Sequence, residues 1–272
     1  MTVFPWRVYT KTELKTEYER LRKKVNEDIK FPIPRSIIGY ICSNNFFQKE
    51  RLSTKGLSNK RLSTIEYWNK PNGRKVILNH SRKHGRDIFN SAVFLSHAPA
   101  QFPIVAAAKI YRYFEATQVF DPYAGWGDRC IAAMASDIDY IGVDSNKKLK
   151  TSFRNMIKTF DTASVVTIIS RKVENTNYKK FDFDLIFTSP PFWQDNVMVE
   201  CYNGSKDNYE DFLDNSLFPI MYEGLERDIW VCLHLPLGMY EDVKKEFGPA
   251  RKIIRINKNT RNINNIDKVY CW

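Results

Sequence analysis

Residues 117–129 read Thr-Gln-Val-Phe-Asp-Pro-Tyr-Ala-Gly-Trp-Gly-Asp-Arg, and small, helix-favouring residues follow as far as Ala135. An apolar run, a Gly-x-Gly turn and a helical stretch predict a β-strand that leads through a tight turn into an α-helix. The glycines let the backbone approach a ligand closely, and the first turn of the helix offers unpaired N–H groups. Taken alone, the pattern also fits an ordinary turn between a strand and a helix.

A second apolar segment, Tyr140-Ile-Gly-Val143, ends in Asp144. In a sheet of parallel strands, an acid at this place can accept hydrogen bonds from ribose hydroxyls. Further apolar runs alternate with helical segments, as expected for helices on both faces of one sheet. We therefore predict an α/β fold with a doubly wound, mostly parallel, seven-stranded sheet. Its strands are expected near residues 117–121, 140–144, 165–170, 183–188 and 228–234, with a terminal antiparallel pair at 251–256 and 268–272.

The fourth predicted strand runs into Ser189-Pro190-Pro191-Phe192 and then Trp193. Prolines fix their own φ and push the preceding residue into extended geometry, so the chain leaves the strand rigidly. One hydroxyl, one carbonyl and one aromatic face are thereby held close together, which suits a planar ring that carries an exocyclic NH2 group. The alternative is a plain loop stiffened by prolines.

Taken together, these motifs and their order give the chain a resemblance to the amino-methyltransferases, which use S-adenosylmethionine to methylate exocyclic nitrogens. That family's Asp-Pro-x-x-Gly-x-Gly segment corresponds to residues 121–127, and its Ser-Pro-Pro-Phe segment to residues 189–192. The resemblance covers roughly residues 95–272 and implies a Rossmann-like methyltransferase domain over 96–272. It implies that Ser189, Pro190, Pro191 and Phe192 hold the target amine. It implies a cofactor site made of Phe102, Pro103, Asp121, Pro122, Tyr123, Gly125, Gly127 and Asp144.

Serine in the first position of the second motif favours cytosine N4 as the target within this family. Methylation of adenine N6, in DNA or RNA, is the main alternative. A sulfonium methyl group is already activated, so the protein has to align the amine and stabilise the charge that develops on it. In duplex DNA, the target base must first be flipped out of the stack.

The charge of the chain is concentrated in its first third. Residues 1–95 contain 20 Lys or Arg and 8 Asp or Glu, whereas the remaining residues contain 22 and 23. This asymmetry predicts a basic nucleic-acid-binding or target-recognition region over residues 1–95, although a merely solvated basic face would look similar. DNA is the expected partner. The candidate contacts are Arg51, Lys55, Lys60, Arg61, Arg74, Lys75, Arg82, Lys83 and Arg86.

Local patterns suggest an α+β structure for this region. Thr10 and Glu13 form a capping-box pattern, and apolar residues then recur at helical spacing, at positions 14, 18, 21 and 25. Residues 64–69 and 75–78 flank Pro71-Asn-Gly73, which predicts a β-hairpin with a basic tip.

Composition narrows the function further. No apolar run approaches the roughly 20 residues of a membrane span, and the N-terminus carries no signal-peptide pattern. The five cysteines form no C-x-x-C pair and do not cluster with the four histidines, so we expect no metal site. We expect the cysteines to be free thiols in a reducing compartment, cytoplasmic or nucleoid-associated. The oligomeric state stays open. A non-catalytic nucleic-acid-binding subunit with the same fold is the alternative from another functional class.

Overall fold

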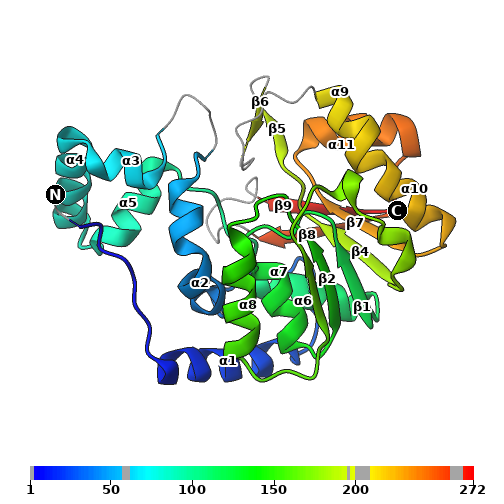
Figure 1. The fold of residues 1–272 in the computed structure, drawn as a ribbon, viewed down its shortest axis with the longest axis horizontal. Coiled ribbons are helices and arrows are strands. Elements are labelled where there is room, and N and C mark those ends of the chain that lie inside the picture. The colour runs from blue at the N-terminus through cyan, green and yellow to red at the C-terminus, as the bar shows by residue number, and fades with distance from the viewer. Residues whose placement is uncertain (1–2, 57–61, 195–196, 200–208, 258–265) are drawn as a thin grey trace.

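A seven-stranded sheet forms the centre of the computed structural model, which describes residues 3–56, 62–194, 197–199, 209–257 and 266–272 (Figure 1). The strands lie in the order β3-β2-β1-β4-β7-β9-β8. The first five of these are parallel, and β9 and β8 are antiparallel to their neighbours. The strands are β1 (Gln118–Asp121), β2 (Asp139–Val143), β3 (Val166–Ile169), β4 (Leu185–Thr188), β7 (Trp230–His234), β8 (Lys252–Asn257) and β9 (Ile266–Cys271).

This arrangement confirms the predicted fold class, because all seven strands lie where the apolar runs suggested. A separate two-stranded hairpin, β5 (Phe192–Gln194) and β6 (Val197–Val199), directly follows the two prolines. The parallel order also confirms the doubly wound connection pattern, since β1 lies at the centre with β2 on one side and β4 on the other.

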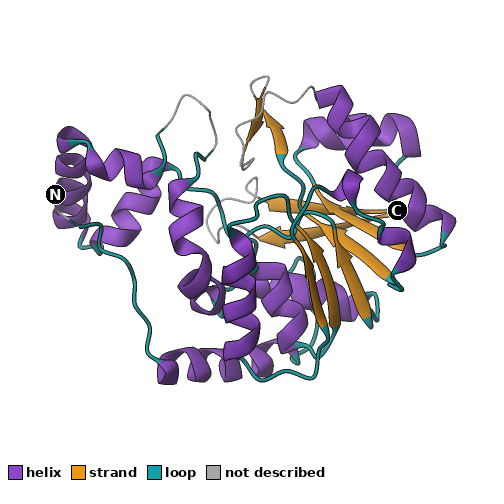
Figure 2. Ribbon diagram, in the orientation of Figure 1, coloured by secondary structure: helices purple, strands orange, loops and turns teal. Residues whose placement is uncertain are grey.

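Helices cover both faces of the sheet (Figure 2). One hydrophobic core contains buried residues of α1 (Lys11–Val25), α6 (Ile104–Tyr113), α7 (Asp128–Ala135) and α8 (Leu149–Thr159). The other contains residues of the π-helical turn η3 (Leu213–Leu217), α10 (Phe218–Glu226) and α11 (Leu237–Phe247). Three short elements complete this half: the 3-10 turns η1 (Val173–Asn175) and η2 (Tyr178–Lys180), and α9 (Tyr209–Phe212).

The N-terminal part of the chain contributes to the same core. The Thr10 capping box forms as predicted and opens α1, whose Leu14, Tyr18, Leu21 and Val25 are buried. The next helix, α2 (Tyr40–Ser53), buries Phe47 in this core as well. The two helices therefore pack directly on the elements that carry the glycine turn. Whether residues 1–95 act as one binding region stays a prediction.

The hairpin predicted at residues 64–78 is wrong. This segment forms α3 (Thr64–Asn69) and α4 (Pro71–His84), and α5 (Ile88–Ser96) follows. Ser63 and Glu66 close a capping box that starts α3, and Pro71 occupies the first turn of α4, where its missing N–H costs nothing. Gly73 is needed because a Cβ there would lie 2.2 Å from the carbonyl oxygen of Tyr67. In the described residues, the first 95 positions are therefore helical rather than α+β, apart from one isolated bridge between Ile33 and Ile256.

Helices α3, α4 and α5 gather around a small core of their own. Its buried apolar side chains are Phe4, Leu52, Trp68, Ile77, Phe89 and Ala92. Figure 1 shows this helical cluster at the end of the molecule away from the sheet.

Candidate active site at the carboxyl edge of the sheet

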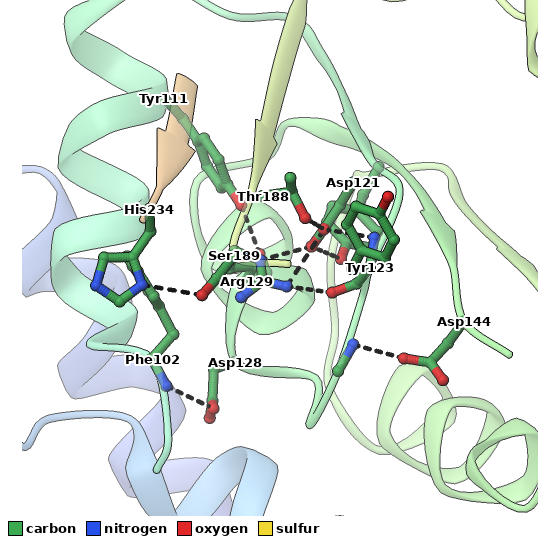
Figure 3. Close-up of polar contacts among 12 residues, drawn as sticks. Phe102, Tyr111, Asp121, Tyr123, Asp128, Arg129, Asp144, Thr188, Ser189 and His234 are labelled. Carbon is green, nitrogen blue, oxygen red and sulfur yellow. Dashed lines mark hydrogen bonds and ion pairs between the residues drawn. The ribbon is translucent and has the colours of Figure 1, made fainter. Parts of the chain in front are cut away.

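Four parallel strands end at the same edge of the sheet, and most of the predicted site residues follow them directly. The glycine turn comes after β1, Asp144 after β2 and Ser189 after β4, and His234 is the last residue of β7. Ligands of open α/β sheets bind outside the carboxyl ends of the strands, on either side of the point where the strand order reverses. Figure 3 shows these residues converging from separate elements.

The turn after β1 depends on its two glycines. Both adopt positive φ angles, +59° at Gly125 and +77° at Gly127, which side chains rarely allow. A Cβ at Gly127 would also lie 2.5 Å from the Phe47 ring of α2, whereas a Cβ at Gly125 would have no neighbour closer than 3.7 Å. Gly127 is therefore fixed by packing and conformation, and Gly125 by conformation alone.

Asp144 is tied to this turn. Its Oδ2 accepts a hydrogen bond of 2.8 Å from the Gly125 N–H, and its Oδ1 accepts one of 2.8 Å from the Asn146 N–H. Burial raises the pKa of Asp144 to about 6, although these two hydrogen bonds favour the ionised form. No Lys or Arg forms an ion pair with this carboxylate in the described part of the chain. Each oxygen keeps a second lone pair that could accept a further hydrogen bond.

Asp121 bonds through its carboxylate to neighbouring elements, and its predicted part in the cofactor site stays a prediction. Its carboxylate is fully buried and accepts hydrogen bonds from Arg129 Nε at 2.7 Å, Tyr140 Oη at 2.6 Å and Thr188 Oγ1 at 2.7 Å. These donors come from α7, β2 and β4, so one carboxylate joins the three elements around β1. Arg129 also donates to the Tyr123 carbonyl and accepts, through its own carbonyl, a hydrogen bond from Tyr111 (Figure 3). Asp121 thus fixes the turn through the elements packed around β1.

Asp128, the first residue of α7, ties the segment before α6 to the same turn. Its carboxylate accepts hydrogen bonds from Ser43 Oγ at 2.5 Å, Gln101 Nε2 at 3.0 Å and the Phe102 N–H at 3.0 Å. Burial raises the pKa of Asp128 to about 6. The predicted cofactor residue Phe102 is buried here, and Pro103 caps the start of α6.

Tyr123 and Pro122 continue the turn toward the opposite face of the sheet. Pro122 is buried, and Tyr123 is half-buried with its hydroxyl 2.8 Å from Ser216 Oγ of η3. The ring of Tyr123 packs on that of Phe212, with centroids 5.7 Å apart. These contacts give the site one wall from the η3 side.

Ser189 lies beside a histidine that the sequence analysis did not select. Its Oγ is 2.9 Å from Nδ1 of His234, and Nε2 of the same ring is 3.3 Å from Oδ1 of Asp267. Aromatic rings pack edge-on against the imidazole on two sides, Phe102 at 5.3 Å and Phe192 at 5.4 Å between centroids. Of the two prolines, Pro190 is buried and Pro191 half-buried.

Trp193 turns to another neighbour. Its ring stacks on that of Tyr209, with centroids 4.9 Å apart and planes 14° from parallel. The half-buried ring of Phe192 is therefore the aromatic surface closer to Ser189, since it contacts the same imidazole.

The predicted nucleic-acid contacts divide by position. Arg51 is only 4% exposed, so its charge is not offered to solvent. It donates hydrogen bonds to the Pro99 carbonyl and to Asn44, both at 2.8 Å, and so holds α2 to the segment before α6. Lys60 and Arg61 lie outside the described residues. The others are exposed or half-buried at the surface, and most belong to α4 or follow it: Lys55, Arg74, Lys75, Arg82, Lys83 and Arg86.

Sequence reasoning missed several residues of the site. His234 could have been found, because it ends a predicted strand at the edge where Ser189 also lies. Asp267 could not, since it reaches His234 only through the register of an antiparallel pair formed late in the chain. Arg129, Tyr140 and Thr188 carry no signal before the fold is known.

Three further features of the described residues concern metal sites, membrane-spanning helices and cavities. No group of three or more His, Cys, Asp or Glu there could hold a metal ion, and no helix there is long and apolar enough to cross a membrane. A cavity of about 760 Å³ lies elsewhere, between the end of α1 and residues 33–38, and contains none of the predicted site residues.

Comparisons with known proteins show only distant similarity. No family model matches the chain, and no curated protein matches it. Among solved structures, it is similar to a human methyltransferase 10 domain containing protein (10% identity, TM-score 0.44, 64% of this chain and 83% of that one). It is also similar to a Pyrococcus abyssi tRNA (uracil-54, C5)-methyltransferase in complex with S-adenosyl-L-homocysteine (15% identity, TM-score 0.43, 62% of this chain but only 37% of that one). Because both TM-scores lie below 0.5, the function has to be argued from the chain's own site.

Proposed function

We propose that this chain is an S-adenosylmethionine-dependent methyltransferase that methylates the exocyclic amino group of a nucleic-acid base, cytosine N4 in DNA. One observation carries the proposal: the Ser189–Phe192 segment and the glycine turn with Asp144 lie at the same edge of the sheet, on either side of β1. This arrangement supports the proposal, because a cofactor held at the turn would lie next to an amine held at Ser189.

The residues of the turn fit the cofactor. A Cβ at Gly125 would have no neighbour closer than 3.7 Å, and the turn leads into the first N–H groups of α7. Asp144 is a half-buried carboxylate whose bonding partners are backbone N–H groups, and ribose hydroxyls would complete its acceptor positions. Asp121 contributes by fixing the turn, because its own oxygens are already occupied.

The residues after β4 fit the amine. The cofactor supplies a methyl group that is already activated, so the protein has to position the nucleophile. Ser189 Oγ and the Pro190 carbonyl accept the two amino hydrogens, which draws the nitrogen toward a tetrahedral shape and frees its lone pair. Phe192 offers a ring surface for the base. Positioning of this kind supplies a large part of the rate in reactions without a protein nucleophile.

The charge on the helical cluster supports a polyanionic partner. Lys75, Arg82 and Lys83 are exposed along α4, away from its buried residues Gly73 and Ile77. Arg74 is half-buried at the flank of the helix, and Arg86 follows the helix. Phosphate contacts of this kind position nucleic acid without reading its sequence. A basic face next to a near-neutral catalytic part is the distribution expected of a nucleic-acid enzyme.

The decisive experiment measures transfer of labelled methyl from S-adenosylmethionine to duplex DNA, single-stranded DNA and RNA, followed by mass spectrometry of the nucleosides. We expect N4-methylcytosine in DNA, and its loss in Ser189→Ala. The control variant Ser164→Ala should keep it, because Ser164 precedes β3 and so lies at the opposite edge of the sheet. Formation of N6-methyladenine would agree with the proposed reaction but contradict cytosine as the target base. No transfer with cofactor binding intact would contradict a nucleic-acid substrate and point to another amine or a missing partner. No transfer and no cofactor binding would favour the non-catalytic nucleic-acid-binding subunit.

A second experiment tests the polymer contacts. Lys75→Glu with Arg82→Glu should weaken DNA binding and lower its dependence on salt, because about two phosphate contacts are lost. The control Lys158→Glu changes an exposed lysine of α8 far from α4 in the chain. An equal effect of both charge changes would contradict a role for the α4 face.

A further inference from the structure

His234 occupies a place that determines what the Ser189 hydroxyl can do. Both of its ring nitrogens have oxygen neighbours, Ser189 Oγ at 2.9 Å from Nδ1 and Asp267 Oδ1 at 3.3 Å from Nε2. The two phenylalanine rings against the imidazole hold its plane. The side chains of His234 and Asp267 are only 13% and 15% exposed, so water competes little for these contacts.

The sheet register explains why the three residues meet. Thr188 of β4 pairs with Leu233 of β7 in parallel, so the next residues, Ser189 and His234, lie side by side. His234 pairs with Val269 of the antiparallel β9, and Asp267 is its diagonal neighbour on the same face. The contact is therefore set by the register of three strands, with Ser189 directly after the end of β4.

The carboxylate selects the tautomer of the imidazole. An ionised carboxylate only accepts hydrogen bonds. If Nε2 carried no proton, it and Asp267 Oδ1 would be two acceptors facing each other, and they would repel. The favourable arrangement puts the proton on Nε2 and leaves Nδ1 of the neutral ring as an acceptor. Ser189 has one hydroxyl proton, and the only role left for it at Nδ1 is that of donor.

We infer that His234 and Asp267 fix the Ser189 hydroxyl as a hydrogen-bond acceptor toward the substrate, so that the site takes rings with an exocyclic amino group and rejects their oxo counterparts. With its proton committed to Nδ1, Ser189 Oγ faces the substrate with lone pairs alone. An amino group donates to it, whereas a ring carbonyl would present a second acceptor. This inference rests on the proposed methyltransferase function. His234 is a positioning residue, since it acts through Ser189.

A serine, a histidine and an aspartate could also form a nucleophilic triad. Acyl transfer requires N–H donors for the oxyanion close to the serine. The two residues that follow Ser189 are prolines, which have no N–H group. The arrangement therefore suits a hydroxyl that accepts, and not one that attacks.

Two substitutions at His234 separate polarity from volume. His234→Leu keeps the approximate size but removes the acceptor, and we expect kcat for methyl transfer to fall about tenfold to hundredfold, as for a buried hydrogen bond lost at a reacting group. His234→Asn places an amide oxygen near the position of Nδ1 and should keep most of kcat. Binding of S-adenosyl-L-homocysteine, measured by calorimetry, should be unchanged in both.

A double-mutant comparison tests whether His234 acts through the serine. We expect Ser189→Ala to lower kcat, and His234→Leu to have no further effect in the Ser189→Ala background, because the positioned group is then absent. If His234→Leu lowers kcat by the same factor in both backgrounds, the imidazole acts by another route and the inference is overturned. A kcat of His234→Asn no higher than that of His234→Leu would also overturn the inference.

Nitrogen-15 NMR of His234 tests the tautomer without any methyl transfer. We expect the neutral ring to carry its proton on Nε2 in the wild type and in Ser189→Ala, and to be a mixture of tautomers in Asp267→Ala. A proton on Nδ1, or on both nitrogens at neutral pH, would overturn the inference even if the enzyme is active. If no polymer is methylated but the Nε2–H tautomer is found, the proposed function fails while the acceptor assignment of Ser189 stands.

Discussion

Replacing Asp121 by asparagine should cost far more stability than any surface charge change of the same kind. The carboxylate is fully buried and faces Arg129, whose side chain is only 7% exposed. Burial disfavours the charged guanidinium, but the adjacent carboxylate more than offsets this and raises the pKa of Arg129. Asp121→Asn leaves that cation buried without its countercharge and leaves one of several donors without an acceptor.

The magnitude follows from the burial of the pair. Removing one partner of a buried ion pair costs about 3–5 kcal/mol of unfolding free energy. In a chain of this size, each kcal/mol lowers Tm by roughly 2–4 °C, so we expect a drop on the order of 10 °C. Urea unfolding followed by circular dichroism would measure the free energy, and an unchanged m value would show that the transition stays two-state.

The matched control is Asp137→Asn. Asp137 also pairs with an arginine through both oxygens, at 2.8 and 2.6 Å from Arg22, but its side chain is 40% exposed and that of Arg22 is 37% exposed. Asn adopts the positive φ of position 137 readily, so the change tests the charge alone. We expect a loss of about 0–1 kcal/mol. Equal losses at the two positions, or less than about 1 kcal/mol at Asp121, would refute the reasoning that the buried carboxylate holds the site together.

Three further predictions concern the glycine turn and its acids. The folded-state pKa of Asp128, about 6, lies above its ordinary value of 3.8, so its contribution to stability is full below pH 4 and is lost as the pH rises to 6. The difference in unfolding free energy between wild type and Asp128→Asn should therefore fall by about 3 kcal/mol across this range in urea titrations, and a constant difference would contradict it. Binding of S-adenosyl-L-homocysteine should tighten as the pH rises through 6 and release protons, since hydroxyl donors favour the ionised Asp144; calorimetry on Asp144→Asn should show neither effect. Gly127→Ala should lower Tm more than Gly125→Ala, because both have positive φ but only the former meets the Phe47 ring; equal shifts would mean that this ring moves aside freely.

The sequence allowed the sheet and the edge of the site to be predicted, since apolar strands, glycine turns and prolines act locally. The seven strands and the residues that follow them appear where these signals stand. The hairpin at residues 64–78 failed because Pro-Asn-Gly is read locally as a turn, while the Ser63 capping box and the first-turn proline favour two helices. Their packing around Trp68 decides between the two.

The inner structure of the site could not be predicted, because it depends on contacts between distant strands. Asp121 was expected to face a ligand, but Arg129, Tyr140 and Thr188 surround it once β1 lies between β2 and β4. Arg51 was expected at the surface, yet it is buried where α2 meets the segment before α6. No local pattern reveals which charged residue the fold will enclose.

The site has two parts, the glycine turn with its acids and Ser189 with its neighbours. They become complete at different lengths of chain. The hydrogen bonds around the glycine turn, from Ser43 through Asp128 and Asp144 to Thr188 and Ser216, join residues within the first 216 positions. The surroundings of Ser189 are complete only when β9 brings Asp267 beside His234. During synthesis on the ribosome, the turn can therefore assemble before the hydroxyl beside it is oriented. On the proposed function, an unfinished chain can hold a cofactor before its acceptor hydroxyl is oriented, and full methyl transfer waits until the last strand joins the sheet.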